Sequence, residues 1–193
     1  MTDNSPSAVE QARGAVTRDR ILAIAQELFC SRTYAGTSMA DIAGRLGTSK
    51  AALYYHFGSK EDILDALLAE PAVQLSAVAD LAARKRPRAT PEELLGALID
   101  LFGGSTAFTT IVGNDASAHA EYVRRHDPMG KIDLILDALA GPRASNTKKI
   151  RARAAVAVAK EGTRTALALE GRLSAKMRAE ILAGALRVLS PPR

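Results

Sequence analysis

The segment TSMADIAGRLGTSKAALYYHF, residues 37–57 of this 193-residue chain, decides the fold that the sequence predicts. Ser38 stands three residues before Asp41, a spacing at which the hydroxyl and the carboxylate cap the start of a helix. Gly47 ends this helix, because glycine readily adopts the left-handed conformation that turns the chain. A second short helix follows at once. Two short helices joined by a glycine turn form a helix-turn-helix, whose second helix can enter the major groove of DNA.

The second helix of the pair has one apolar edge and a larger surface of polar and small residues. Leu53 and Phe57, four residues apart, point toward the core. The other side chains suit DNA, because hydroxyls and backbone N–H groups bind phosphate, lysine reaches guanine or phosphate, and alanines permit close approach. The alternative is a pair of ordinary surface helices that bind no DNA. We expect DNA contacts from Thr48, Ser49, Lys50, Ala51, Ala52, Tyr54 and Tyr55.

The flanking sequence extends this pattern. Residues 17–34 predict a preceding helix, and Ser59 caps a fourth helix with two acidic residues in its first turn. The block around LYYHFGSKEDIL, residues 53–64, resembles the DNA-binding domain of TetR/AcrR-type transcriptional repressors. The resemblance covers residues 17–68, about a quarter of the chain.

The resemblance implies roles for individual residues. Lys60 is expected to anchor a phosphate at the start of the fourth helix, and Thr37 and Ser38 to lie near the DNA backbone. His56 is expected to be structural rather than base-reading. The recognition helix spans residues 49–55, and it is expected to present to DNA the side chains of Lys50, Ala51, Ala52, Tyr54 and Tyr55.

The composition favours an all-α protein that holds an N-terminal three-helix DNA-binding domain and a second helical domain. Hydrophobic residues make up 47% of the chain, and the alternation of β-branched or aromatic residues that marks strands is nearly absent. We expect a flexible tail over residues 1–16, a helix-turn-helix domain over 17–60, and a helical effector-binding and dimerisation domain over 61–193.

We expect a cytoplasmic protein of bacterial type. No apolar run approaches the roughly 18 residues that span a membrane, and the start of the chain lacks the apolar region of a signal peptide. The single cysteine, Cys30, is expected to be a buried small hydrophobe. The net charge of +5 suits a polyanionic partner, but residues 1–70 carry −2 and residues 71–193 carry +7, so this excess does not mark the DNA-binding face. For Arg18 and Arg20 two interpretations remain, contact with DNA or ordinary exposure to water.

The second domain is expected to contain a series of helices separated by two linkers. The linkers are residues 84–91, which are basic and broken by proline, and residues 141–146. Pro71 falls inside the fourth-helix pattern and is expected to kink or split that helix. The expected helices cover residues 91–103, 105–112, 115–126, 128–140, 147–170 and 174–189.

The last two expected helices carry stripes of small and apolar residues that predict close helix packing. Pairing with the same helices of a second copy forms a four-helix bundle and a homodimer, which the resemblance also implies; packing within one chain is the alternative. A twofold dimer places two recognition helices about 34–36 Å apart and predicts a palindromic operator. The stripes contain Ala155, Ala159, Gly162, Ala166, Leu169, Met177, Ile181, Ala185 and Val188.

A regulator of this kind also implies a pocket for a small-molecule effector in the helical domain. Such pockets are mostly apolar with a few placed polar groups. For each aromatic residue an ordinary core position is the alternative, and Glu161 and Arg164 are also spaced to pair across one helical turn. The candidate lining residues are Phe102, Phe108, Ile111, His119, Tyr122, Leu134, Glu161, Arg164 and Thr165.

Together these patterns predict a ligand-responsive transcriptional regulator, expected to act as a repressor, in which an effector shifts the spacing of the recognition helices and releases double-stranded DNA. Two alternatives remain: a sequence-tolerant DNA-binding protein, and a ligand-sensing dimer without specific DNA binding. An enzyme is not expected, because no nucleophile–histidine set or phosphate-binding glycine loop is present in the sequence. The sequence predicts no metal site and no cofactor.

Overall fold

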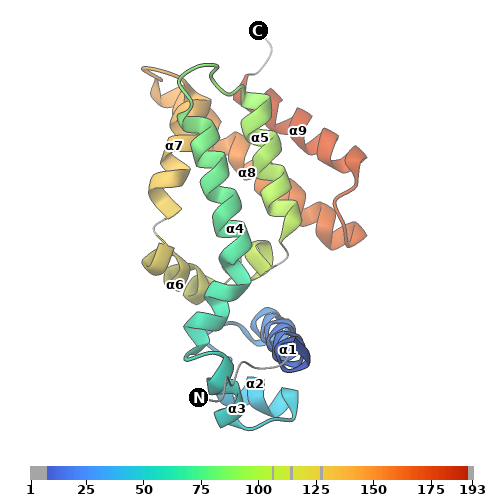
Figure 1. Ribbon diagram of the computed structural model, residues 1–193. Coiled ribbons are helices and arrows are strands. Elements are labelled where there is room, and N and C mark those ends of the chain that lie inside the picture. Colours follow the sequence, from blue (N-terminus) through green and yellow to red (C-terminus); the bar gives the residue numbers. More distant parts are fainter. Residues whose placement is uncertain (1–7, 106, 114, 127, 191–193) are drawn as a thin grey trace.

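The computed structural model describes residues 8–105, 107–113, 115–126 and 128–190, and every regular element in these ranges is helical (Figure 1). The all-α prediction is therefore confirmed. The elements are α1 (Ala8–Arg32), α2 (Met39–Leu46), α3 (Lys50–His56), α4 (Lys60–Ala83), α5 (Pro91–Gly104), the π-helix η1 (Ala107–Val112), α6 (Ala116–His126), α7 (Pro128–Ala140), α8 (Asn146–Glu170) and α9 (Ala175–Leu189).

Serine and threonine caps set where most of these helices begin. In each case the side-chain hydroxyl accepts a hydrogen bond from a backbone N–H of the first turn, which would otherwise be left without a partner. These caps explain why the observed starts agree closely with the expected ones for α2, α3, α4, α5, α8 and α9. The capping residues are Ser38, Ser49, Ser59, Thr90, Ser145 and Ser174.

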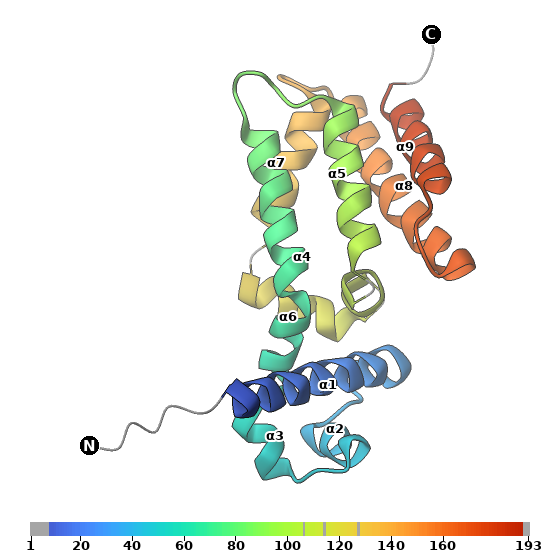
Figure 2. The same ribbon diagram turned by 45° about the vertical axis from the view of Figure 1, so that its right-hand side comes forward.

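The helices form two units that α4 connects. α1, α2 and α3 lie at one end of the molecule, and α5, α7, α8 and α9 lie at the other (Figure 1). α1 runs across the base of α4 and also contacts η1 (Figure 2). α4 contributes Ile63, Leu64 and Leu68 to the core of the first unit, and Leu75 and Val78 to the core of the second. A movement of α4 therefore has to affect both cores.

Pro71 is buried inside α4 and does not divide it, so of the two expected outcomes, a kink or a split, the split is wrong. By length and composition α4 is also apolar enough to cross a membrane, with a mean hydropathy of 1.3 over an 18-residue window. The expectation that no stretch approaches this length and apolarity does not hold for α4. Its buried residues belong to two protein cores, which accounts for the composition.

Three further expectations need correction. α1 begins at Ala8, so the expected tail is already helical from that residue, while residues 1–7 lie outside the described ranges. The helix expected over residues 105–112 is a π-helix. Cys30 is exposed, because it lies on the side of α1 away from the buried Ala25, Leu28 and Phe29.

The small-residue stripes of α8 and α9 mainly serve packing within one chain. Ala155, Ala159 and Ala185 have no exposed surface and belong to the second core. A Cβ atom on Gly162 would lie 3.1 Å from two carbon atoms of Ile181, so glycine lets α8 and α9 approach closely. Ala166 is also buried, Met177, Ile181 and Val188 are half-buried, and Leu169 is 74% exposed. The intramolecular alternative therefore accounts for the buried alanines, and any dimer contact has to use other faces of these helices.

Candidate functional site

The turn between α2 and α3 is fixed by local bonds. At the start of α2, the Ser38 hydroxyl accepts from the backbone N–H of Asp41 at 3.2 Å, and the Asp41 carboxylate accepts from the N–H of Ser38 at 2.8 Å. Bonds from the Ser38 hydroxyl and backbone hold the pKa of Asp41 below its ordinary value. Gly47 ends α2 with φ 69°, the left-handed conformation that the sequence predicts. α3 therefore leaves the turn in a defined direction.

α3 has one buried edge and one open surface. Leu53 and Phe57 are buried against α1 and α4, and the Ser49 hydroxyl accepts from the N–H of Ala52 at 3.1 Å. Tyr54 is 51% exposed and Tyr55 is 87% exposed, values that leave both rings available to a partner. The predicted contact residues that lie exposed are Thr48, Ser49, Lys50, Ala51, Ala52, Tyr54 and Tyr55.

Two of the other predicted DNA contacts hold the protein's own backbone. Thr37 is buried, and its hydroxyl donates to the carbonyls of Leu28 and Thr33 at 3.3 and 2.8 Å, so its side chain does not face DNA as expected. The Lys60 ammonium donates to the carbonyls of Tyr34 and Thr37 at 2.7 and 2.9 Å. The same ammonium also lies 4.1 Å from the centre of the Tyr34 ring.

Arg18 supports the far end of α3, a role that the sequence did not indicate. Its guanidinium donates to the carbonyl of His56 at 3.2 Å and lies 4.1 Å from the centre of the Phe57 ring. His56 is half-buried, and its ring meets the Tyr55 ring edge-on with centres 5.3 Å apart. Arg18 and the Ser49 cap therefore fix α3 at its two ends.

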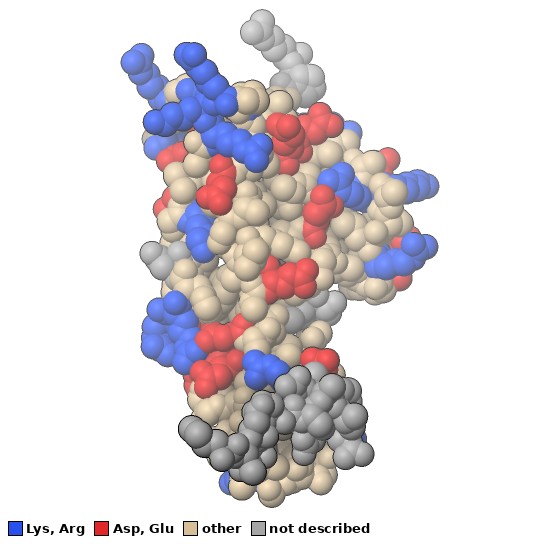
Figure 3. Space-filling model, in the orientation of Figure 1, with Lys and Arg blue, Asp and Glu red and all other residues tan. Residues whose placement is uncertain are grey.

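Positive charge gathers away from this helix. In Figure 3 lysine and arginine cluster at the end of the helical domain remote from α3, near the α4–α5 and α7–α8 loops. Five of these cations, Arg84, Lys85, Arg88, Arg143 and Lys149, line a groove there. This placement agrees with the expectation that the net charge does not mark the DNA-binding face.

The helical domain contains a partly open cavity of about 170 Å³ that is lined by α4, α5, η1, α6, α7 and α8. Of the candidate lining residues, Phe102, Phe108, His119 and Tyr122 line it. Its other walls come from residues that the sequence did not single out: Leu75, Leu98, Leu101, Thr109, Gly113, Pro128, Met129, Ile132, Ile135, Leu136, Val156 and Lys160.

The remaining candidate pocket residues lie elsewhere. Ile111 is buried in the first core, and Leu134 is half exposed. Glu161, Arg164 and Thr165 are on α8 outside the cavity lining. The carboxylate of Glu161 pairs with Arg164 at 2.7 Å, which was the alternative interpretation of this pair.

A row of rings leads from the cavity toward α4. The Phe108 ring stacks on Phe102 with centres 6.3 Å apart and meets Tyr122 edge-on at 5.8 Å. Tyr122 in turn contacts the ring of His126 at 5.0 Å. Burial raises the pKa of Tyr122, so its hydroxyl stays protonated at neutral pH. The cavity wall is thus in contact with the C-terminal end of α6.

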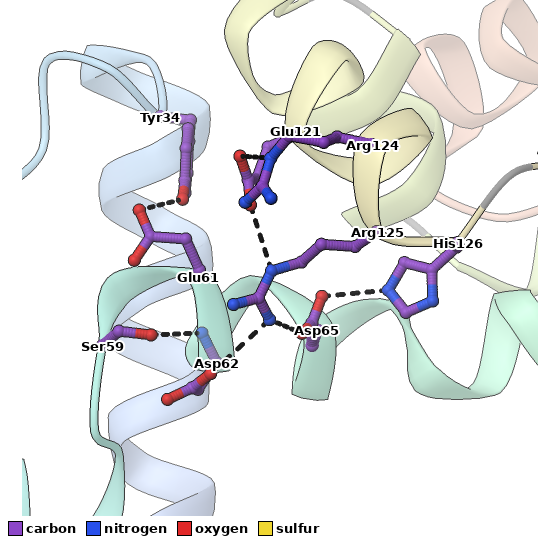
Figure 4. Close-up of polar contacts among 9 residues, drawn as sticks. All are labelled: Tyr34, Ser59, Glu61, Asp62, Asp65, Glu121, Arg124, Arg125 and His126. Carbon is purple, nitrogen blue, oxygen red and sulfur yellow. Dashed lines mark hydrogen bonds and ion pairs between the residues drawn. The ribbon is translucent and has the colours of Figure 1, made fainter.

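The same end of α6 is joined to α4 by ion pairs, which we call the α4–α6 cluster: Asp62, Asp65, Glu121, Arg125 and His126 (Figure 4). Arg125 contacts Asp65 and Asp62 from α4 and Glu121 from its own helix, the last at 3.0 Å. A nitrogen of His126 lies 2.9 Å from the Asp65 carboxylate. These contacts link one wall of the cavity to the first turns of α4.

Two further bonds tie α6 and α4 to the α1–α2 loop. The Tyr34 hydroxyl donates to Glu61 at 3.1 Å, and the Tyr34 N–H donates to Asp115, which caps α6. Burial, together with the neighbouring Glu61, raises the pKa of Tyr34. Burial also tends to raise the pKa of Asp115, but bonds from Ser117, Tyr34 and Ala118 outweigh it and lower this pKa. Tyr34 thus contacts both helices that flank the domain boundary.

The first unit is similar in sequence to known transcriptional regulators. Residues 21–67 match the family model for bacterial regulatory proteins of the tetR family. The chain is 40% identical over 52 residues to the HTH-type transcriptional regulator TtgR of Pseudomonas putida, a match that covers 27% of this chain and 25% of that protein. It is 44% identical over 48 residues to the negative transcriptional regulator IcaR of the Staphylococcus aureus biofilm operon icaADBC, covering 25% and 26%. The chain thus matches these relatives over about a quarter of their length.

Solved structures match over nearly the whole fold. A TetR-like transcriptional regulator from Rhodococcus sp. RHA1 is 22% identical, with a TM-score of 0.63 over 92% of this chain and 98% of that one. Mycobacterium smegmatis AmtR is 23% identical, with a TM-score of 0.62 over 100% and 91%. At these identities the likeness concerns the fold. Residues 21–67 thus match the tetR family in sequence, and the chain as a whole shares the fold of these solved regulators.

Proposed function

We propose that the protein is a ligand-responsive transcriptional repressor that acts in the cytoplasm and binds a palindromic operator as a homodimer. The observation that carries this proposal is the form of α3: a seven-residue helix, capped by Ser49 and anchored by Leu53, whose exposed surface includes Lys50, Tyr54 and Tyr55. Side chains of this kind on such a helix read base edges and hold phosphates in the major groove. The match to the tetR family model, over residues 21–67, includes this helix.

Phosphate contacts are expected beside α3. A hollow of about 520 Å³ lies between the starts of α2 and α4 and the side of α3, and Ser38, Lys50, Tyr54 and Lys60 line it. The first residues of α2 and α4 line this hollow, and helix N-termini attract phosphate. We assign Lys50 and the two tyrosines to DNA contact, and Ser38 and Lys60 to the DNA backbone.

The dimer is expected to form through the outward faces of α8 and α9. Ala157, Thr165 and Leu169 of α8, and Ala179 of α9, are exposed and free of the intrachain packing that buries Ala155, Ala159, Ala166 and Ala185. Small exposed side chains allow the helices of two copies to approach closely. A twofold pair of this kind places two copies of α3 about one DNA turn apart, roughly 34–36 Å.

The α4–α6 cluster supplies the route by which an effector would release DNA. Tyr122 lines the cavity and contacts His126, which is paired with Asp65 at the start of α4. An effector that binds more tightly when α6 is shifted would move Asp65 and, with it, the start of α4. Because α4 follows α3 in the chain, the distance between the two copies of α3 in the dimer would then change. The change in operator affinity equals the difference in effector affinity between the two arrangements.

Selection from random duplexes tests the proposal. The purified full-length chain should be a dimer by light scattering and should prefer one inverted repeat by at least about a thousandfold over random DNA. Lys50→Ala should weaken operator binding by about 1–3 kcal/mol and relax base preference at one position in each half-site. Tyr55→Ala should also weaken binding, because it removes a hydroxyl that can donate to phosphate.

The control is Lys85→Ala, which removes the same charge from the loop remote from α3 and should leave operator affinity almost unchanged. Lys60→Ala is less suitable, because it also leaves the carbonyls of Tyr34 and Thr37 without their donor. A monomeric protein, or one that enriches no inverted repeat in the selection, would contradict the proposal.

A further inference from the structure

The cavity of the helical domain has the properties of a site for a small apolar molecule. Aliphatic and aromatic side chains make up most of its lining, from Leu75 on α4 to Val156 on α8. Its volume of about 170 Å³ is close to the roughly 150 Å³ of an engineered apolar cavity that stays dry and binds benzene. The space therefore suits a single ring or an alkyl chain of about six to eight carbons.

The few polar groups of the cavity favour a ligand that accepts hydrogen bonds. Thr109, His119, Tyr122 and Lys160 are the polar residues of the described lining, which contains neither aspartate nor glutamate. Thr109 already donates to the carbonyl of Ser105 at 3.1 Å. Lys160 brings a positive charge, and among the described residues its ammonium forms an ion pair with Glu161, which lies 3.9 Å away and outside the lining.

Tyr122 adds a hydrogen-bond donor to the same cavity. The residue is only 3% exposed and lines the cavity. Its hydroxyl is able to donate a hydrogen bond to an acceptor bound there. His119, one turn earlier on α6, lines the same space. The polar residues of the described lining thus come from η1, α6 and α8, while α4, α5 and α7 contribute apolar residues.

We propose that the cavity binds a compact hydrophobic acid, a monocarboxylate with a single ring or a short alkyl chain, whose carboxylate accepts hydrogen bonds from Lys160 and Tyr122. The assignment of this molecule as the effector rests on the proposed regulatory function; its binding to the cavity does not. An amine of the same size is disfavoured, because Lys160 repels it and the described lining offers no carboxylate to pair with it. An alcohol fills the same space without the charge-assisted bond.

Calorimetric titration of the full-length protein, without DNA, with octanoate, octan-1-ol and octylamine tests the chemistry of the site. Octanoate should bind about tenfold more tightly than octan-1-ol, since a hydrogen bond to a charged group contributes more than a neutral one. Octylamine should bind most weakly. Equal affinities for acid and alcohol, or tighter binding of the amine, would overturn the proposal.

Three variants locate the interaction. Lys160→Met keeps the length of the side chain and should remove the preference for acid over alcohol, whereas Lys160→Arg should retain it. Lys176→Met changes an exposed lysine of α9 outside the cavity and should leave all three affinities unchanged. Leu98→Phe should fill the cavity and weaken all three ligands together, with a thermal melt confirming that the variant is folded. An acid preference that survives Lys160→Met would contradict the assignment of the carboxylate.

Gel shifts with the selected operator then separate this inference from the proposed function. Selective octanoate binding by a protein that prefers no operator would support the acid site and contradict the repressor. Specific operator binding by a protein whose cavity shows no preference for the acid would support the repressor and contradict the acid site.

Discussion

The two hydrophobic cores of the molecule are built in different ways. The first joins α1, α2, α3 and the start of α4 through large side chains, such as Phe29, Leu53 and Phe57. The second joins long helices through alanines such as Ala155 and Ala159, and leaves a cavity beside them. Large side chains that fill a small core fix the position of α3, while the looser helical domain has room for a ligand. The two proposed activities, reading DNA and sensing a small molecule, thus make opposite demands on packing.

The boundary between the units is polar, in contrast to both cores. The α4–α6 cluster and the bonds of Tyr34 lie between them, and most of these groups are partly exposed to water. Partly exposed ion pairs contribute little to stability, but they depend strongly on geometry. This boundary is therefore suited to change its arrangement at low cost in free energy.

The largest effects are expected from truncating each core. Leu53→Ala and Ile99→Ala should each lower the free energy of unfolding by about 2–5 kcal/mol, because both side chains are fully buried. If the two cores form independent units, Leu53→Ala should abolish operator binding while octanoate binding to the cavity persists. Urea unfolding followed by circular dichroism, together with calorimetric titration, measures both properties.

Ile99→Ala supplies the reverse comparison. It should weaken ligand binding, because it loosens the core next to the cavity wall formed by Leu98 and Leu101. Loss of both activities in both variants would mean that α4 joins the cores into one cooperative unit.

The sequence predicted the first unit well, because its signals are local. Ser38 and Asp41 stand three residues apart, and Gly47 directly follows the helix that it ends, so each signal lies within one turn of its effect. Leu53 is buried as its spacing predicted. Thr37 and Lys60 were misjudged in part, because the sequence does not reveal which loop carbonyls need a donor in the folded chain.

The second unit was predicted less well, because its features combine distant segments. The cavity is lined from six elements, and nothing in the sequence around Val156 or Lys160 distinguishes them from other residues of α8. The stripe containing Ala155 and Ala159 indicates close packing equally well within a chain and between chains. The packing of α5 against α8 shows that these alanines face the core of the same chain.

Asp65→Ala should uncouple the two units. It removes the α4 partner of His126 and one partner of Arg125, while leaving the cavity lining intact. We expect the effect of octanoate on operator affinity to fall by about 5–150-fold, the range of a coupling free energy of 1–3 kcal/mol, with little change in octanoate binding alone. Gel shifts with and without octanoate measure this. Asp80→Ala removes an exposed carboxylate further along α4 and serves as the control.

Asp115→Asn should weaken the boundary in a pH-dependent way. The amide keeps an oxygen to cap α6 but presents an NH₂ group to the Tyr34 N–H, which we expect to lower the free energy of unfolding by about 1–2 kcal/mol at pH 7. Because folding lowers the pKa of Asp115, its stabilisation is present above its ordinary value of 3.8 and is lost as pH falls through the lower folded value.

Urea unfolding of both proteins between pH 7 and pH 2 tests this sign. The difference in free energy of unfolding between wild type and Asp115→Asn should stay constant down to about pH 4 and shrink below it. A difference that grows in acid would show that the carboxylate is not stabilised in the folded protein.

The smallest effects, from two glycines of the DNA-binding unit, should have opposite signs. A Cβ atom on Gly47 or on Gly44 meets no atom within 4 Å, so only the backbone distinguishes the two sites. Gly47 has φ 69°, and Gly47→Ala should lower the free energy of unfolding by about 1 kcal/mol. Gly44 lies inside α2, and Gly44→Ala should raise it by about 0.5–1 kcal/mol. Thermal unfolding measures both, and shifts of the same sign would show that packing, rather than conformation, governs this turn, as it does where Gly162 meets Ile181 in the helical domain.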